Sequence, residues 1–189
     1  MQFSTLLTGA FASFVAANSV HFVNQDQTER TIIFTAQAPL QKIPTLVVPP
    51  GGSADATFPD SWIGNWYSVS KGAENVPGML GEVRFQGYNG HTYFDVSAIV
   101  KPDDNVGVKM ITPKNFKTPF SGCQSFPCTN AYNKWDDIAT LSTPDVDLIC
   151  LLGNLPAQKR SNVARAVKEF VNLKAHVRHA REFITGPQL

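Results

Sequence analysis

The chain has 189 residues and a formal net charge of +1, with 43% hydrophobic and only 16% charged residues. This length suits one domain of ordinary size, or one domain with an appendage, and the hydrophobic content is sufficient for a core. The charged fraction lies well below the roughly 25% of typical soluble domains, while Phe, Gly and Pro number 13 each. The composition therefore argues against a helical protein and indicates a β protein rich in loops.

The chain begins with an apolar run rich in small residues, MQFSTLLTGAFASFVAANSV. The run is short for a membrane span, and it contains Val15-Ala16-Ala17, which fits the small-residue rule of signal peptidase. We predict that residues 1–17 are a signal peptide, although the positive charge usual at its start is missing. The alternative is a buried N-terminal helix. A signal peptide implies a secreted protein, located outside the cell or in the cell wall.

The middle of the chain contains short segments that alternate polar and apolar residues between turn signals, as β-strands do. Residues 20–24 and 30–36 are predicted to form one hairpin, and residues 81–87 and 92–100 another around Asn89-Gly90. Residues 107–113 are expected to pair with the strand before them. Further strands are predicted at residues 45–52, 55–59, 65–70 and 145–153. Many short strands between Gly and Pro residues predict a sandwich or barrel over residues 18–155.

Three cysteines leave an odd thiol in a protein whose secretion would permit disulfides. Cys123 and Cys128 bracket a short Pro-containing loop and are predicted to form a disulfide. Cys150 lies in an apolar, strand-like run and is expected to be a buried free thiol. The cysteines have no clustered histidines beside them, so they give no zinc signature. We predict neither a metal nor a cofactor.

Residues 156–189 differ from the rest of the chain in pattern and charge. Apolar residues recur there at helical spacing, and the segment carries seven Lys or Arg against two Asp or Glu. We predict a basic amphipathic helix that either packs on the β domain or contacts an anionic membrane surface or a partner protein. The Lys159-Arg160 pair near its start is a candidate processing site.

Three ordered segments, residues 20–36, 61–100 and 130–150, carry motifs that together resemble one family. The N-terminal segment resembles the first hairpin of thaumatin-like proteins. The middle segment resembles that family's Trp-rich loop, Leu-x-Glu strand and aromatic-Asp-Val-Ser strand, and the last segment resembles its closing stretch. The resemblance is strongest to small, cysteine-poor members secreted by fungi, some of which are described as antigens or candidate effectors. It implies a thaumatin-like antiparallel β-sandwich, to which the C-terminal helix would be an addition.

Two acidic residues are candidates for catalysis. In plant thaumatin-like proteins an acidic cleft is attributed to a Glu and an Asp whose motif positions are occupied here by Glu82 and Asp95, while Val100 replaces the next Asp. Two carboxyl groups can hydrolyse a glycosidic bond when one is protonated and the other ionised. The expected hairpin register places Glu82 opposite residue 97 and diagonal to Asp95, and alternation puts Asp95 on the outer face, where it need not be buried. The alternative is that both are solvated acids without a function.

Aromatic residues near these acids are candidates for ligand binding. Sugar rings stack on aromatic faces, so an aromatic strip beside carboxylates can hold a polysaccharide without cutting it. The alternative is that the tryptophans belong to the core, as is common in a small sandwich. The candidates are Trp62, Trp66, Tyr67, Tyr88 and Tyr93.

The sequence therefore supports three functions from different classes. The first is non-catalytic binding of a cell-wall polysaccharide such as β-glucan, or an effector or antigen role that involves a host protein. The second is a weak β-1,3-glucanase that uses Glu82 and Asp95. The third is binding of a membrane or partner through the basic tail. Motifs for phosphate loops, serine hydrolases and zinc proteases are missing from the sequence, and we expect no nucleic-acid partner.

Overall fold

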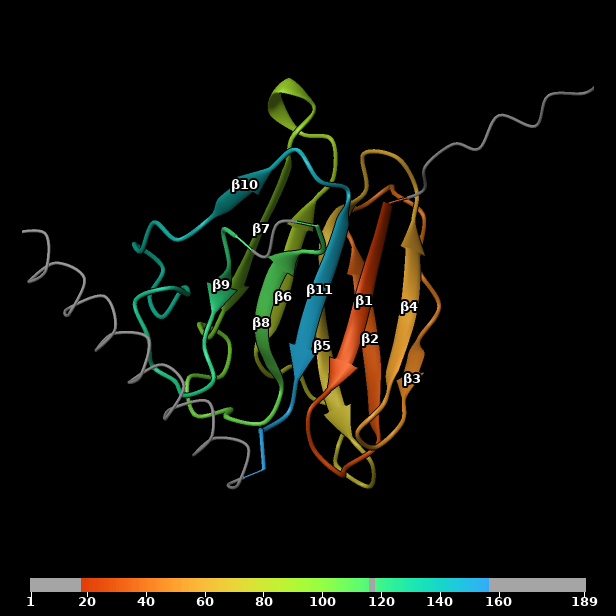
Figure 1. The fold of residues 1–189 in the computed structure, drawn as a ribbon, viewed down its shortest axis with the longest axis vertical. Coiled ribbons are helices and arrows are strands. Elements are labelled where there is room, and N and C mark those ends of the chain that lie inside the picture. Colours follow the sequence, from red (N-terminus) through yellow and green to blue (C-terminus); the bar gives the residue numbers. More distant parts are fainter. Residues whose placement is uncertain (1–17, 116–117, 157–189) are drawn as a thin grey trace, which may run out of the picture.

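The computed structural model describes residues 18–115 and 118–156, which form two β-sheets packed face to face (Figure 1). One sheet has five strands in the order β4-β1-β11-β8-β9, and the other has six in the order β10-β7-β6-β5-β2-β3. The five-stranded sheet contains β1 (Asn18–Asn24), β4 (Ser53–Phe58), β8 (Val108–Pro113), β9 (Ser121–Gly122) and β11 (Asp147–Leu152). The six-stranded sheet contains β2 (Arg30–Ala36), β3 (Leu46–Val48), β5 (Ile63–Ser70), β6 (Leu80–Arg84), β7 (Thr92–Ser97) and β10 (Leu141–Thr143). The prediction of a mainly β, sandwich-like domain is confirmed.

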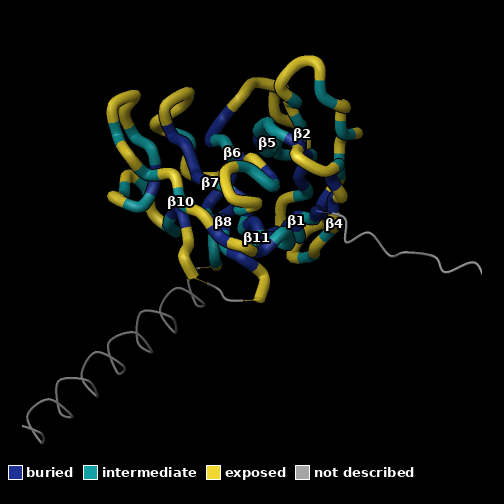
Figure 2. The backbone as a smooth tube through the Cα atoms, turned by 90° about the horizontal axis from the view of Figure 1, so that it is seen from above, coloured by how far each residue is buried: buried dark blue, intermediate teal, exposed yellow. Residues whose placement is uncertain are grey.

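The core lies between the two sheets and is rich in aromatic rings. Figure 2 shows the buried parts of the strands inside the molecule and the exposed loops around them. Trp66 is fully buried, and its ring contacts that of Phe22 edge-on with 5.5 Å between centroids. The ring centroid of Phe58 lies 4.9 Å from that of Trp62 and 5.3 Å from that of Phe85. Because side chains alternate along a strand, the residues that precede Trp66 and Val83 and follow Phe94, which are buried core residues of β5, β6 and β7, point to the outer face of the six-stranded sheet.

Gly81 of β6 lies directly against the ring of Trp66. A Cβ atom at this position would come within 2.5 Å of the indole, which is closer than any real contact between these atoms. The sheet therefore requires a residue without a side chain beside Trp66, and the next residue along β6, Glu82, is brought to the outer face.

Two of the predicted strand pairings are wrong. β1 and β2 do not form a hairpin, because the chain crosses from one sheet to the other between them, and β1 pairs with β4 and β11. Likewise, β8 pairs with β9 and β11 rather than with β7. The pairing of β1 with β11 is parallel, so the sandwich is not purely antiparallel. Strands that are neighbours in sequence often pair, but β1 and β2, and likewise β7 and β8, belong to opposite sheets.

The hairpin of β6 and β7 is confirmed, but its register differs from the prediction. A 3-10 turn, Tyr88–Gly90, lies in the connection, and Glu82 pairs directly with Asp95 instead of residue 97. Asn89 and Gly90 both have positive φ angles, 53° and 74°, as the Asn-Gly signal predicts. The predicted register is wrong because the connection between β6 and β7 has more residues before Asn89-Gly90 than after it.

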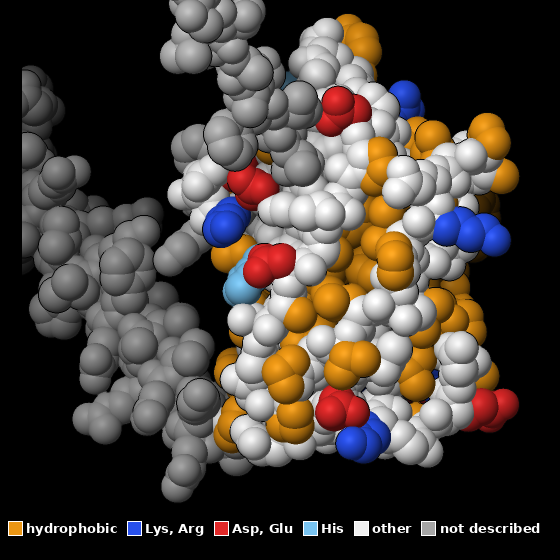
Figure 3. All heavy atoms as spheres, turned by 90° about the vertical axis from the view of Figure 1, so that its right-hand side faces the viewer, with side chains coloured by type: hydrophobic (Ala, Val, Ile, Leu, Met, Phe, Trp, Pro, Cys, Tyr) orange, Lys and Arg blue, Asp and Glu red, His pale blue; other side chains and the backbone are white. Residues whose placement is uncertain are grey.

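The side of the sandwich that carries β3 and β4 exposes apolar side chains in a hollowed strip (Figure 3). These strands are the edges of their sheets. Leu40 and Ile43, in the segment before β3, are partly buried and pack against the core. This segment therefore closes one open end of the sandwich.

The cysteine predictions are confirmed. Cys123 and Cys128 form a disulfide, and Cys150 is a free, fully buried thiol. Burial raises the pKa of the Cys150 thiol to about 12, against a smaller opposing effect of the neighbouring Trp66 indole.

The predicted signal peptide (residues 1–17) and nearly all of the predicted basic helix, including Lys159-Arg160, lie outside the described residues. Among the residues that are described, no helix is long and apolar enough to cross a membrane.

Candidate functional site

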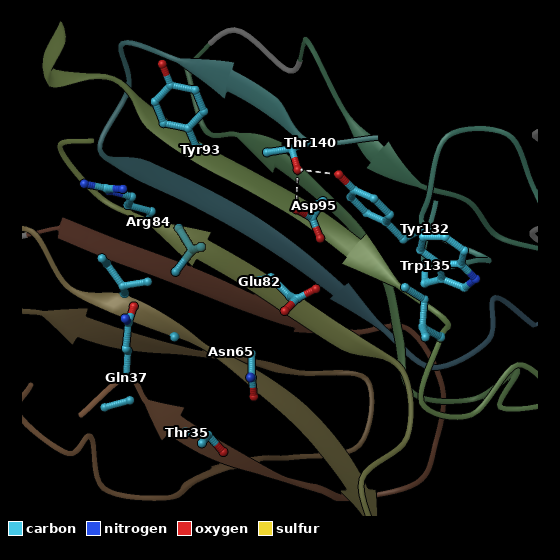
Figure 4. Close-up of a pocket in the computed structure, with 15 residues that line it drawn as sticks. Thr35, Gln37, Asn65, Glu82, Arg84, Tyr93, Asp95, Tyr132, Trp135 and Thr140 are labelled. Carbon is cyan, nitrogen blue, oxygen red and sulfur yellow. Dashed lines mark hydrogen bonds between the residues drawn. The ribbon is translucent and has the colours of Figure 1, made fainter. Parts of the chain in front are cut away.

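A hollow of about 510 Å³ opens on the outer face of the six-stranded sheet (Figure 4). Strands β2, β5, β6 and β7 form its floor, and the segment around residues 132–140 forms one wall. The predicted acids Glu82 and Asp95 and the predicted aromatic residue Tyr93 line this hollow. Side chains that the sequence did not single out also line it: Thr35, Asn65, Arg84, Tyr132, Trp135 and Thr140.

Glu82 and Asp95 are direct cross-strand partners on β6 and β7. Side chains paired in this way have Cβ atoms about 4.5–5.5 Å apart and point to the same face. Asp95 is only 7% exposed, whereas Glu82 is half-buried. The expectation that Asp95 need not be buried is therefore wrong: it does lie on the outer face of its sheet, but the 132–140 segment covers it.

The surroundings of Asp95 favour its protonated form. Burial and the negative charge of the neighbouring Glu82 raise the pKa of Asp95 to about 7, although a hydrogen bond from Thr140 opposes the shift. The Thr140 hydroxyl donates to Oδ2 of Asp95 over 3.0 Å, and it also bonds to the hydroxyl of Tyr132 over 2.9 Å. Oδ1 of Asp95 is buried, and a side-chain hydrogen bond between Asp95 and Glu82 also raises the pKa of Asp95. The site thus holds two carboxyl groups side by side, and the pKa of one of them, Asp95, is raised to about 7.

Trp135 is the aromatic residue of the site that the sequence pattern did not reveal. It lines the hollow, yet 87% of it is exposed. Asp137 fixes the turn that carries it, because its Oδ2 accepts hydrogen bonds from the N–H groups of Asn133 and Lys134 over 2.7 and 2.8 Å. The available signal was the polar setting of Trp135 in NKWDD, which lacks the strand-like alternation around the other two tryptophans.

The five predicted aromatic residues do not form one strip in the structure. Trp62 and Trp66 are 1% and 0% exposed and belong to the core, so their rings offer no surface to a ligand, and the prediction that they bind one is wrong. Tyr67 is 9% exposed, and its hydroxyl donates to Asn75 over 3.0 Å. Tyr88 is 75% exposed, but it lies on the turn outside the hollow. Of the five, Tyr93 alone lines the site.

Within the described part of the chain, no group of three or more His, Cys, Asp or Glu side chains is arranged to hold a metal ion. The side chains that line the hollow offer hydroxyl, amide, carboxyl, guanidinium and aromatic groups.

Fold and site together define a small two-sheet β protein with an acidic, aromatic-rimmed hollow on one sheet. The chain is 50% identical over 135 residues to the antigenic protein SchS21 of Stachybotrys chartarum, an alignment that covers 71% of this chain and 94% of the relative. The protein belongs to the family of SchS21. It also resembles the crystal structure of the protein elicitor MoHrip2 of Magnaporthe oryzae, with a TM-score of 0.56 and 14% identity over 72% of this chain and 99% of MoHrip2. No family model matches the chain.

The assignment to the thaumatin-like family is therefore wrong. The relationship to SchS21, at 50% identity over nearly the whole relative, decides the family, whereas the quoted motifs were short and individually unspecific. This correction removes the family argument for Glu82 and Asp95. The direct pairing of Glu82 with Asp95 and their place in the hollow do not depend on the family.

Proposed function

We propose that the protein binds carbohydrate through the hollow on the six-stranded sheet. The observation that carries this proposal is an 87% exposed tryptophan, Trp135, beside a buried acidic pair in a hollow of about 510 Å³. Exposure of a whole indole to water is unfavourable, and a sugar ring offers an apolar C–H face to cover it. Glu82 and Asp95 then supply an acceptor and a donor for sugar hydroxyls on the floor.

We further propose that the protein is secreted by a fungus and is met by a host. The names of its relatives support this part: SchS21 is called an antigenic protein and MoHrip2 a protein elicitor. Both names describe proteins that another organism detects. The disulfide between Cys123 and Cys128 also favours an oxidising environment outside the cytosol. A cell-wall polysaccharide such as β-glucan is then an accessible ligand.

Binding can be tested by retention of the mature protein on insoluble β-1,3-glucan, cellulose, chitin and xylan. We expect retention on at least one of them, and a loss of affinity of about tenfold or more in Trp135→Ala, equivalent to about 1.4 kcal/mol. Tyr88→Ala is the matched control, because Tyr88 is an exposed aromatic residue outside the hollow. Retention on none of the four polymers, or equal weakening by the two variants, would contradict the proposal.

Glycoside hydrolysis is the second candidate function, and the direct pairing of Glu82 with Asp95 favours it. A protonated Asp95 is suited to act as general acid, and the Glu82 carboxyl group, its direct neighbour, as nucleophile or base. Retaining glycosidases hold their two carboxyl groups about 5–5.5 Å apart, which a direct cross-strand pair can provide. Release of reducing ends from β-1,3-glucan by the wild type, lost in Glu82→Gln, would establish this activity. Binding without any release would reject it and leave the first proposal intact.

A further inference from the structure

The polar side chains on the floor of the hollow form a straight row across four adjacent strands. In the sheet register, Thr35 of β2 pairs with Asn65 of β5, which pairs with Glu82 of β6, which pairs with Asp95 of β7. All four line the hollow, and Figure 4 shows them one after another, with Thr140 beyond Asp95. The row therefore runs perpendicular to the strands.

The length of this row follows from sheet geometry. Neighbouring strands are about 4.8 Å apart, so the three steps from Thr35 to Asp95 span roughly 14 Å. A single sugar ring covers only part of that distance. The row is thus longer than a monosaccharide site requires, and Trp135 lies to one side of it, next to Tyr132 and near Glu82 and Asp95 (Figure 4).

The composition of the row indicates which ligand fits it. Thr35 and Asn65 offer a hydroxyl and an amide, each able to donate and accept, and Glu82 and Asp95 offer carboxyl oxygens. Asp95 is more than nine-tenths buried and lines the hollow directly beside its cross-strand partner Glu82. The acidic end disfavours a ligand with negative charge there and favours one rich in hydroxyl groups.

The backbone of the floor argues against a peptide as the ligand. A peptide that adds to a sheet needs a free strand edge, but β2, β5, β6 and β7 are all interior strands with partners on both sides. Recognition must therefore come from side chains that point out of the sheet. Hydroxyl groups at regular intervals along a sugar polymer satisfy this condition.

We propose, on the basis of the proposed carbohydrate binding, that the ligand is an internal segment of a neutral, linear polysaccharide that lies across the strands from Asp95 to Thr35, with Trp135 beside its Asp95 end. The Asp95 end, with Trp135, holds the first sugar units, and Asn65 and Thr35 add contacts that only a longer chain reaches. Affinity therefore depends on chain length.

Calorimetric titration with a series of β-1,3-linked glucose oligomers, and a parallel β-1,4-linked series, tests this inference. We expect affinity to rise by about tenfold or more between the shortest oligomer that binds and the oligomer that fills the row. Asn65→Ala and Thr35→Ala should lower affinity for the long oligomers by severalfold and leave that of the shortest one unchanged. Thr57→Ala is the matched control, because Thr57 is an exposed strand threonine on the other sheet.

The outcomes separate the two proposals. Equal affinity for short and long oligomers, or equal weakening of both by Asn65→Ala, would overturn the extended-chain inference and leave carbohydrate binding standing. The absence of binding by any oligomer of either series, together with no retention on the polymers, would overturn both.

Discussion

At the scale of single residues, Asp95 shows how pairing changes the chemistry of a side chain. It is one of two carboxyl groups on adjacent strands, and it lies under the 132–140 segment, where ionisation is unfavourable. Its retention of a proton up to a pKa of about 7 makes it a hydrogen-bond donor under mildly acidic conditions. The same property makes the stability of the protein depend on pH.

The first prediction concerns this pH dependence. The pKa of Asp95 is higher in the folded state than the usual 3.8, so the folded state holds a proton that the unfolded state has lost. Folding stability should therefore fall as the pH rises from about 4 to about 7. Asp95→Asn removes this cost and should stabilise the protein near pH 8, by up to about 4 kcal/mol at about 1.4 kcal/mol per pKa unit.

Urea unfolding of the wild type and of Asp95→Asn near pH 4.5 and near pH 8 measures the effect. The gap between the two proteins should be larger at the higher pH. A gap that is the same at both pH values would show that Asp95 titrates normally.

The tryptophans show which part of the site could be predicted from sequence. Alternation correctly assigned Asp95 to the outer face, but it was not applied to Trp62 and Trp66, whose β-strand surroundings favoured burial. Trp135 lies in a loop, where no periodicity exists to place its side chain. Its role depends on the folding of residues 132–140 over β7, a contact between segments distant in sequence that local patterns do not encode.

At the scale of structural elements, the segment of residues 132–140 is the wall that completes the site. Its position on the sheet is fixed by backbone hydrogen bonds at both sides of Tyr132, whose N–H donates to Val96 O over 2.9 Å and whose carbonyl accepts from Ala98 N–H over 2.7 Å. Asp137 then shapes the turn that presents Trp135.

We predict that Asp137→Ala weakens carbohydrate binding severalfold, because the turn loses the acceptor that orders Asn133 and Lys134. The fold should be retained, since Asp137 lies on the surface. Titration with a glucan oligomer, alongside far-UV circular dichroism, measures both effects. Asp136→Ala is the control for removing a charge at the exposed neighbouring position, and an equal loss in the two variants would show that charge rather than turn geometry matters.

The crossing from β1 to β2 is held by an ion pair between the buried Arg30 and the partly exposed Asp26. Arg30 is 2% exposed, and its Nη2 donates to Oδ2 of Asp26 over 2.6 Å. Burial by itself would raise the pKa of Asp26, but hydrogen bonds from Thr28, Arg30 and Asn154 outweigh it and lower the pKa. Asp26 thus joins the crossing to the segment that follows β11.

Asp26→Asn should destabilise the protein by about 3–5 kcal/mol, because it leaves the Arg30 charge buried without its partner. The pKa of Asp26 is lowered in the folded state, so the wild type should lose stability as the pH falls below about 3.8 and Asp26 becomes protonated. Chemical denaturation measures both, with Glu29→Gln as the control. Glu29 pairs with the exposed Lys71 over 3.3 Å, so that substitution should cost less than about 1 kcal/mol. Similar losses in the two variants would contradict a structural role for this ion pair.

At the scale of the whole molecule, the sequence was informative about local structure and uninformative about how the layers connect. The Asn89-Gly90 turn identified the β6–β7 hairpin because both ends of that hairpin are close in sequence. The parallel pairing of β1 with β11 joins residues 18–24 to residues 147–152, and nothing in either strand encodes it. The row from Thr35 to Asp95 combines the predicted β6–β7 hairpin with the β2–β5 and β5–β6 pairings, whose registers the sequence did not indicate.

Carbohydrate binding on the outer face of the six-stranded sheet, against Trp135, is the central claim to be tested. The chain has three tryptophans, so an ¹⁵N NMR titration with a glucan oligomer reports on three indole N–H signals. We predict that the signal of Trp135 shifts with saturation, together with the side-chain amide of Asn65. The signals of the buried Trp62 and Trp66 should move far less. Saturable binding that leaves the Trp135 indole and the Asn65 amide unmoved would contradict the claim.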